Sequence, residues 1–196
     1  MLRRLFAHAA LLLSVSPAGS GARAHSTAPG PAAPWLQGAT CYEVFVRSFR
    51  DSDGDGSGDL NGLLGGLDYI NDGNPSSTRS LGARCLWLMP VMDSPGYHGY
   101  DVRDYYRVAP AYGTNADFKR FVREAHRRGI RVLVDMVLNH VSSQYRPFQA
   151  ALRDPASSYR DWFRFAPRPG PPNRWGANNW HRSPLRDEYY YGFFSQ

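Results

Sequence analysis

The sequence predicts an α/β fold in which short parallel strands alternate with helices. Three short apolar segments, residues 41–49, 85–89 and 130–137, have the composition of strands. Two segments between them, residues 60–70 and 115–128, carry apolar side chains at helical spacing. This order of strands and helices favours a parallel sheet joined by crossover helices.

Local signals support each element in turn. Residues 41–49 alternate in polarity, and residues 85–89 are closed by Pro90. A run of leucines followed by Ile70 predicts the helix over 60–70, and the polar residues 71–80 predict a loop. For the helix over 115–128, Thr114 is the expected N-cap, with Asp117 in the first turn, and Gly129 is the expected terminator.

The pattern changes after His140. Residues 141–196 are rich in Arg, Trp, Tyr, Pro and Asn and have little periodicity, which indicates an insertion after the third strand. We expect a short helix over 144–152, a possible strand over 189–194 and loops elsewhere. The many aromatic side chains of this segment could form a small core or the wall of a cleft.

Composition and charge limit the classes of partner. The net charge of +6 comes from 23 Lys and Arg against 17 Asp and Glu. Arg3, Arg4 and Arg23 lie in the first 24 residues, which contain no acid, so the remainder has 20 basic against 17 acidic residues, or +3. There is no basic stripe, and we expect no nucleic-acid binding and no membrane span.

The N-terminus resembles an export signal. Residues 1–24 combine two arginines, an apolar stretch too short to cross a bilayer and a cleavage site at Ala22-Arg23-Ala24. The alternative is an ordinary amphipathic helix. Residues 25–38 form a Ser/Pro/Ala-rich linker. Because of the export signal, we expect a secreted or periplasmic protein. Export would permit a disulfide between Cys41 and Cys85, but the sequence leaves that pairing open.

Polar side chains end the third strand. Asp135, Asn139 and His140 follow a short apolar run in which such groups are costly to bury unless a site uses them. The carboxyl ends of parallel strands are where ligands bind in open and closed α/β sheets. The alternative is that these side chains only satisfy loop backbone.

A glycine-rich acidic loop is the second strong signal. Carboxylates occupy alternate positions of a segment in which glycine lets the chain wrap around one point: Asp51, Asp53, Asp55 and Asp59, with Ser57 placed to offer its backbone carbonyl. Converging carboxylates repel one another unless a hard cation lies between them, and Ca²⁺ suits such oxygen ligands. The alternative is a solvated acidic turn.

A third motif, Tyr97-His98-Gly99-Tyr100-Asp101, follows the second strand. An aromatic ring beside polar donors suits a sugar, because the ring covers the apolar sugar face and the donors bind hydroxyls. By itself the motif could equally be surface-loop packing.

Together these segments resemble the α-amylase superfamily, glycoside hydrolase family 13. Residues 41–49 and 86–90 are similar to its first two barrel strands, and residues 135–140 match its D-x-x-x-N-H signature. The resemblance implies the N-terminal three β/α units of a (β/α)8 TIM barrel in residues 39–140, and the start of an inserted domain B in 141–196. It also implies retaining chemistry at α-glucosidic bonds, performed by two carboxylates.

The resemblance assigns roles to individual residues. Tyr100 would stack on the sugar at subsite −1, with His98 and His140 bonding the same sugar, and Asp135 would support the site from behind. Asn139 would help hold a calcium ion shared with domain B, and the acidic loop matches the metal loop of the oligo-1,6-glucosidase branch.

The family's catalytic carboxylates come from strands four, five and seven. We therefore expect no catalytic residue in this chain and no hydrolysis by this chain alone. Tyr97 stands where exo-acting α-glucosidases often have aspartate, which favours an α-amylase acting on starch or maltodextrin. An exo-α-glucosidase, a glucanotransferase and a non-catalytic binding protein of the superfamily are the alternatives.

Overall fold

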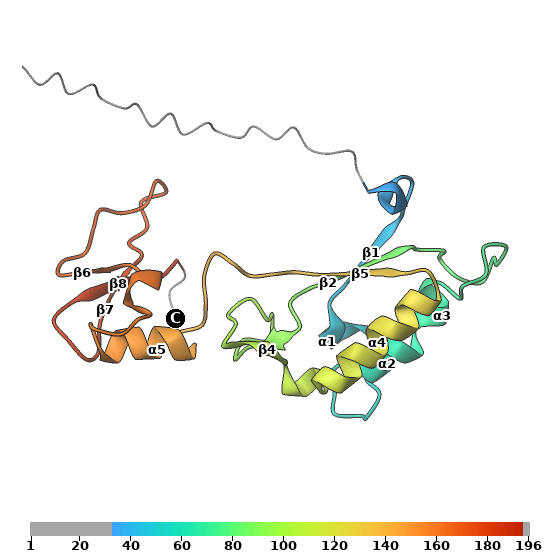
Figure 1. The fold of residues 1–196 in the computed structure, drawn as a ribbon, viewed down its shortest axis with the longest axis horizontal. Helices are drawn as coiled ribbons and strands as arrows, with labels where there is room; N and C mark the ends of the chain where they lie inside the picture. The colour runs from blue at the N-terminus through green and yellow to red at the C-terminus, as the bar shows by residue number, and fades with distance from the viewer. Residues whose placement is uncertain (1–32, 194–196) are drawn as a thin grey trace, which may run out of the picture. The chain divides into compact units, whose positions relative to one another are not determined.

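The computed structural model describes residues 33–193 (Figure 1). The expected export signal and the first part of the expected linker lie outside the described residues. The chain divides into two units, with the boundary between residues 37 and 38. The described part of the first unit contains one 3-10 turn, η1 (Pro34–Leu36). All other elements belong to the second unit.

A three-stranded parallel sheet forms the centre of the second unit, as predicted. Its strands β1 (Cys41–Val44), β2 (Cys85–Leu88) and β5 (Arg131–Val134) lie in the order β1-β2-β5. Val44 pairs with Leu88, and Leu88 with Val134, so the three carboxyl ends are level with one another. All loops that leave these ends start from the same edge of the sheet.

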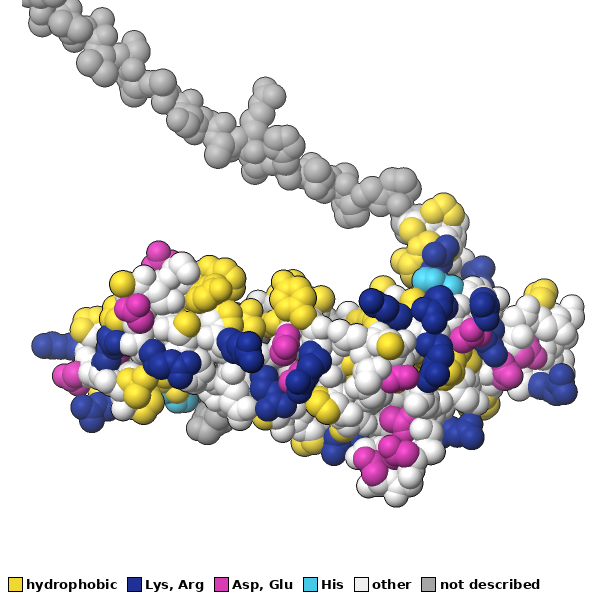
Figure 2. Space-filling view, turned by 60° about the horizontal axis from the view of Figure 1, so that its bottom comes forward, with side chains coloured by type: hydrophobic (Ala, Val, Ile, Leu, Met, Phe, Trp, Pro, Cys, Tyr) yellow, Lys and Arg dark blue, Asp and Glu magenta, His cyan; other side chains and the backbone are white. Residues whose placement is uncertain are grey.

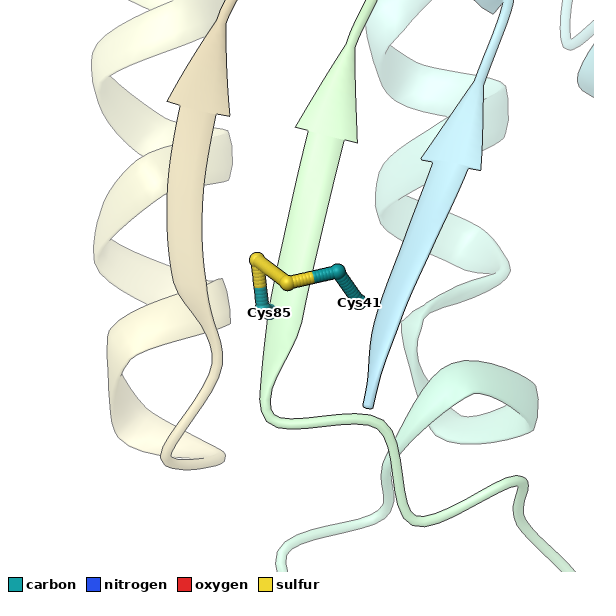
Figure 3. The surroundings of a disulfide bond; sticks show 2 residues. All are labelled: Cys41 and Cys85. Atoms are coloured by element: carbon teal, nitrogen blue, oxygen red, sulfur yellow. A yellow bond between two sulfur atoms is a disulfide. The ribbon is translucent and has the colours of Figure 1, made fainter. Parts of the chain in front are cut away.

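Helices α2 (Leu60–Gly65), α3 (Leu67–Ile70) and α4 (Asn115–Arg127) lie on one side of the sheet, behind the strands in Figure 3. Alternate strand residues point to this side and meet the apolar faces of the helices. The resulting core is fully buried at its centre, which includes Leu63, Leu67, Ile70, Leu86, Leu88, Phe121, Ala125 and Ile130.

The ends of α4 follow the predicted signals. The Thr114 hydroxyl accepts from the Asp117 N–H while the Asp117 carboxylate accepts from the Thr114 N–H, which is a capping box. At the other end Gly129 adopts φ 75°, and Gly129 and Ile130 donate their N–H groups back to the carbonyls of His126 and Ala125.

The helix expected over 60–70 is interrupted at Gly66, which ends α2 and precedes α3. A Cβ at Gly66 would lie 2.6 Å from Cε1 of Phe49, so this close approach requires glycine. Gly66 itself keeps φ −96° and ψ −1°, in the right-handed helical region, so the interruption is local.

Two strands are shorter in the structure than the sequence predicted. The first ends at Val44, and residues Val46–Phe49 form a helical turn, α1. The third ends at Val134 rather than at residue 137. Both strands end where β2 ends, because β2 lies between them. Met89 donates its N–H to the carbonyl of Val44, and the following Pro90 has no N–H with which to continue the hydrogen-bonded ladder.

A small antiparallel hairpin follows β2 and was not predicted. It pairs β3 (Met92–Asp93) with β4 (Asp104–Val108), and a 3-10 turn, η2 (Pro110–Tyr112), leads on to α4. Asp93 is 3% exposed and is held by Arg103 at 2.7 Å and by Arg107 at 2.9 Å. This paired buried charge fixes the base of the loop that carries the Tyr97-to-Asp101 motif.

The segment after His140 is more ordered than expected. Its helix α5 (Arg146–Arg153) starts two residues late, where Pro147 occupies the first turn. The turn η3 (Arg160–Trp162) follows, and three short strands, β6 (Phe165–Ala166), β7 (Trp180–Arg182) and β8 (Tyr189–Tyr191), form an antiparallel sheet in the order β6-β8-β7. Only β8 was predicted among these strands.

The aromatic residues of this segment pack in part around α5. Phe148 is 6% exposed, and its ring lies between 5.1 and 6.3 Å from those of Phe163, Phe165 and Tyr190. The expected small core is therefore present, although Trp162 and Trp175 remain exposed.

Charged side chains are spread over the face drawn in Figure 2, where Lys and Arg lie next to Asp and Glu. Among residues 33–193, no helix is long and apolar enough to cross a membrane.

Cys41 and Cys85 form a disulfide, which settles the pairing that the sequence left open (Figure 3). The two cysteines are directly paired in the parallel register and begin β1 and β2. The bond therefore joins the two strands at the end opposite to the edge where the functional loops start.

Replacing both cysteines by serine is expected to lower the free energy of unfolding by roughly 4 kcal/mol, because the bond closes a loop with a sequence separation of 44 residues. Urea denaturation with and without reductant measures this, and reductant should not affect the double-serine variant. Equal stability of the two proteins would show that the bond does not constrain the unfolded chain.

Asp59 is the N-cap of α2 and gives a pH-dependent prediction. Burial opposes its charge, but hydrogen bonds from Gly62, Ser52 and Asn61 outweigh burial and hold the pKa below its ordinary value of 3.8. A lowered folded-state pKa means that this stabilisation is present above the unfolded-state pKa and is lost as pH falls through the folded-state value.

We expect Asp59→Ala to cost about 1–2 kcal/mol at pH 7, as typical N-cap losses do. Asp59→Asn keeps an acceptor at the cap but removes the charge. It should cost less at pH 7 and lose less stability than the wild type as the pH falls below about 4. Urea midpoints across this range provide the measurement; parallel curves for wild type and Asp59→Asn would exclude the charge as the source.

Candidate functional site

Three loops meet at the carboxyl edge of the sheet because β1, β2 and β5 are parallel and in register. The acidic loop lies between the turn that follows β1 and helix α2. The Tyr97-to-Asp101 motif lies in the loop of the hairpin that follows β2, and Asp135 comes directly after β5.

Asp135 is the centre of this edge. Its Oδ2 accepts a 2.6 Å hydrogen bond from the Tyr100 hydroxyl, and its Oδ1 accepts a 2.8 Å hydrogen bond from Nε1 of Trp87. Its backbone N–H donates to the carbonyl of Leu88 at 2.9 Å. The structure thus joins Tyr100 and Asp135, which the sequence placed on different segments, and adds Trp87.

The hydrogen bond to Asp135, together with burial and the negative charges of Asp135 and Glu43, raises the pKa of Tyr100 to about 12. The phenol therefore keeps its proton at neutral pH and acts as a donor to the carboxylate. This bond fixes the ring of Tyr100 against rotation out of the edge, as a stacking platform requires.

His98 is placed beside the same ring. Its Nδ1 accepts a 3.0 Å hydrogen bond from the Tyr100 N–H, and its ring stacks on that of Tyr100 with centroids 6.0 Å apart. Because Nδ1 accepts, the proton of the neutral imidazole belongs on Nε2, which leaves Nε2 as a donor. The ring of Tyr97 meets that of His98 edge-on, with centroids 5.5 Å apart, and Tyr97 is 69% exposed.

The loop that carries these rings is closed by Asp101. Its Oδ1 accepts from the Ser94 hydroxyl and from the Gly96 N–H, the latter at 3.1 Å. A Cβ at Gly96 would lie 2.5 Å from this oxygen, so the closure requires glycine. Asp101 therefore has a structural role in holding the loop of His98 and Tyr100.

His140 and Asn139 lie five and four residues beyond Asp135 in the same segment. Asn139 Nδ2 is 3.4 Å from Nδ1 of His140. The Tyr105 hydroxyl, from β4, donates to the carbonyl of Val137 and lies 3.4 Å from that of His140. Tyr105 was not predicted as a site residue, yet it ties this segment to the hairpin.

The acidic loop brings three of its four carboxylates together. Oxygens of Asp51, Asp53 and Asp59 lie within 4.8 Å of one another. Oxygens bound to one Ca²⁺ at 2.3–2.6 Å can be at most about 5 Å apart, so this spacing fits a single ion. Asp55 is outside this group, and its Oδ1 accepts from the Ser57 N–H.

Backbone N–H groups shape the triad. Asp51 accepts from Gly54 at 2.7 Å, from Gly56 at 2.8 Å and from Asp53 at 3.0 Å. The bonds from Gly54 and Gly56 are the main reasons that the pKa of Asp51 is lowered. These bonds favour the charged form of the Asp51 carboxylate and fix its orientation within the loop.

Comparison with known proteins identifies the family. A family model for the α-amylase catalytic domain matches residues 43–196. Alpha-amylase 3 of Dictyoglomus thermophilum is 44% identical over 161 residues, which cover 82% of this chain and 30% of that protein. Oligo-1,6-glucosidase of Heyndrickxia coagulans is 38% identical over 170 residues, which cover 83% and 29%.

Solved structures agree with these relatives. The α-amylase from H. orenii superimposes with a TM-score of 0.72 at 48% identity and covers 80% of this chain and 32% of its own. A complex of a MutB mutant with glucose gives a TM-score of 0.73 at 36% identity. The chain spans about 30% of the length of these relatives.

The family model covers the sheet from residue 43, its three carboxyl-end loops and the segment that follows His140. The sheet corresponds to the first three β/α units of a (β/α)8 barrel. This chain therefore belongs to the α-amylase family, glycoside hydrolase family 13.

Proposed function

We propose that the protein containing this chain hydrolyses α-1,4-glucosidic bonds in starch or maltodextrins, with retention and by internal cleavage. The observation that carries the proposal is the arrangement of Asp135, Tyr100 and His98, in which an oriented phenol ring lies beside an imidazole donor. Such a pair suits a glucose ring, because the ring covers its apolar face and the donor binds a hydroxyl.

The residues of this chain would bind and orient the substrate. Retaining hydrolysis needs a nucleophile and a proton donor about 5 Å apart. The family resemblance assigns both to strands that follow β5 in the barrel. Asp135 would not replace them, because its two oxygens are already engaged by Tyr100 and Trp87.

Internal cleavage is favoured by Tyr97. Its exposed ring lies beside that of His98, with centroids 5.5 Å apart, and offers a further apolar surface to a long glucan. A carboxylate at this place would instead bind the hydroxyls of a chain end. Hydrolysis of maltoheptaose blocked at its non-reducing end tests this point, because exo-acting enzymes leave it intact.

We also propose that the acidic loop binds Ca²⁺ through Asp51, Asp53 and Asp59, with Asp55 and the Ser57 carbonyl joining when the ion is present. The spacing of the triad supports this proposal. Asn139 would contribute to a separate calcium ion at the inserted segment. Bound at the loop, the ion would neutralise the clustered charge and fix the start of α2.

Export to an oxidising compartment is the third part of the proposal. The N-terminal signal pattern supports it, and so does the Cys41–Cys85 disulfide, since such bonds are rare in the cytosol. Recovery of the protein in the medium or periplasm with His25 as its first residue would agree with it; an intact N-terminus in the cytosol would not.

Substitution of the sugar-contacting residues should lower kcat/KM on starch in the full-length protein. We expect Tyr100→Ala and His140→Ala each to lose at least about tenfold, because both would touch the sugar that distorts toward the transition state. Tyr100→Phe keeps the ring and should lose less than Tyr100→Ala.

Tyr106→Ala is the matched control, since Tyr106 lies in β4 and is 90% exposed. Its kinetics should equal those of the wild type. Wild-type kinetics in Tyr100→Ala would place the sugar elsewhere.

Calcium should raise the melting temperature of the wild type. Binding to the native state alone stabilises by about 2.7 kcal/mol at a hundredfold excess over the dissociation constant. Asp53→Ala removes an exposed member of the triad and should abolish most of the shift between calcium and chelator. Asp55→Ala tests whether the fourth carboxylate joins the ion.

Asp72→Ala provides the matched control, because Asp72 caps a similar polar turn outside the triad. Its calcium response should be unchanged. Identical melting curves of the wild type in calcium and in chelator would rule out a metal at this loop.

A further inference from the structure

Trp87 lies on the face of the sheet that is turned away from the helices. It is the third residue of β2, the middle strand, between Leu86 and Leu88, which are both 0% exposed and point toward the helices. Trp87 points to the opposite face and is 42% exposed among the described residues. In a (β/α)8 barrel this face lines the interior, which side chains fill, so apolar packing alone does not specify an indole here.

The indole makes a directional contact instead. Its Nε1–H donates to Oδ1 of Asp135 at 2.8 Å, across to the neighbouring strand. The strand register pairs Leu88 with Val134, so Trp87 and Asp135 lie one residue to either side of that pair. Both point to the same face of the sheet, and the bond runs diagonally between the strands.

The two donors on Asp135 constrain its carboxylate from different elements. Trp87 holds Oδ1 from β2, and Tyr100 holds Oδ2 from the hairpin loop. Rotation of the carboxylate about its last torsion would break both bonds. Each donor thus limits the freedom of the other, with Asp135 as the rigid link between them.

We propose that Trp87 is a positioning residue, which fixes the carboxylate of Asp135 and through it the ring of Tyr100. This inference rests on the proposed function, in which Tyr100 carries the sugar. Phenylalanine at residue 87 would keep an aromatic ring in place and remove only the donor. Asp135 would then be held by Tyr100 alone, and the partner of the Tyr100 hydroxyl would be less constrained.

The first test is independent of activity. In the 15N-labelled full-length protein, the indole N–H signal of Trp87 is assigned by its loss in Trp87→Phe. Asp135→Ala should shift this signal and speed its exchange with solvent, and the milder Asp135→Asn should change it in the same direction. The Tyr106→Ala control should leave the signal unmoved. An unchanged Trp87 signal in both Asp135 variants would overturn the proposal.

The second test asks whether Trp87 acts through Asp135. Trp87→Phe should lower kcat/KM on starch about tenfold in the wild type and less than about twofold in the Asp135→Asn background, because the contact is already weakened there. A packing role would give the same factor in both backgrounds, and that result would overturn the proposal.

The two tests also separate this inference from the proposed function. If the full-length protein hydrolyses no α-glucan, the proposed function fails, while the indole signals still decide whether Trp87 holds Asp135. If hydrolysis is normal and the signals do not respond, the positioning role fails by itself.

Discussion

Parallel pairing in register is the constraint on which the rest of this structure depends. Because Val44, Leu88 and Val134 lie level with one another, Asp135 and the loops after β1 and β2 lie at the same carboxyl edge of the sheet. A shift of one residue in β5 would turn Asp135 to the helix side, where its charge would be buried without Tyr100 or Trp87. The pattern of buried leucines and valines that fixes the register therefore also fixes the site.

The carboxylates at this edge accept hydrogen bonds or form ion pairs with neighbouring residues. Asp135 accepts from two side chains, Asp101 closes the loop of His98, and Asp93 anchors the hairpin through two arginines. Each of these acids limits the motion of a neighbouring segment. Sugar recognition requires rings and donors at fixed positions, and an edge assembled from loops obtains that rigidity from such contacts.

Features encoded within a few residues could be predicted from the sequence, whereas features that depend on distant contacts could not. Thr114, Asp117 and Gly129 act on the helix in which they lie, so the bounds of α4 followed from local signals. The ring of Phe49 lies against Gly66, and β1 and β5 end beside Pro90, the second residue after β2; both contacts join segments that are distant in the sequence. The hairpin of β3 and β4 depends on the pairing of Asp93 with Arg103 and Arg107, which no local sequence pattern indicates.

The same division holds for the site. The motifs around Tyr100 and Asp135 were visible, and the family resemblance gave them roles. Trp87 was overlooked because a tryptophan between two leucines looks like any apolar strand residue. Alternation along β2 was the available signal, since it puts Trp87 on the face of Asp135. In the acidic loop, regular spacing suggested four equivalent carboxylates, but only Asp51, Asp53 and Asp59 converge, while Asp55 accepts from the Ser57 N–H.

The disulfide has one more consequence. Cys41 and Cys85 enclose the acidic loop, α2, α3 and the polar loop of residues 71–80 in a covalent ring. A protease that cuts once anywhere in this ring leaves the two pieces attached to each other through sulfur. Loops that are exposed to solvent in the ring can thus be nicked without the first strand leaving the molecule, and damage there becomes visible only under reducing conditions.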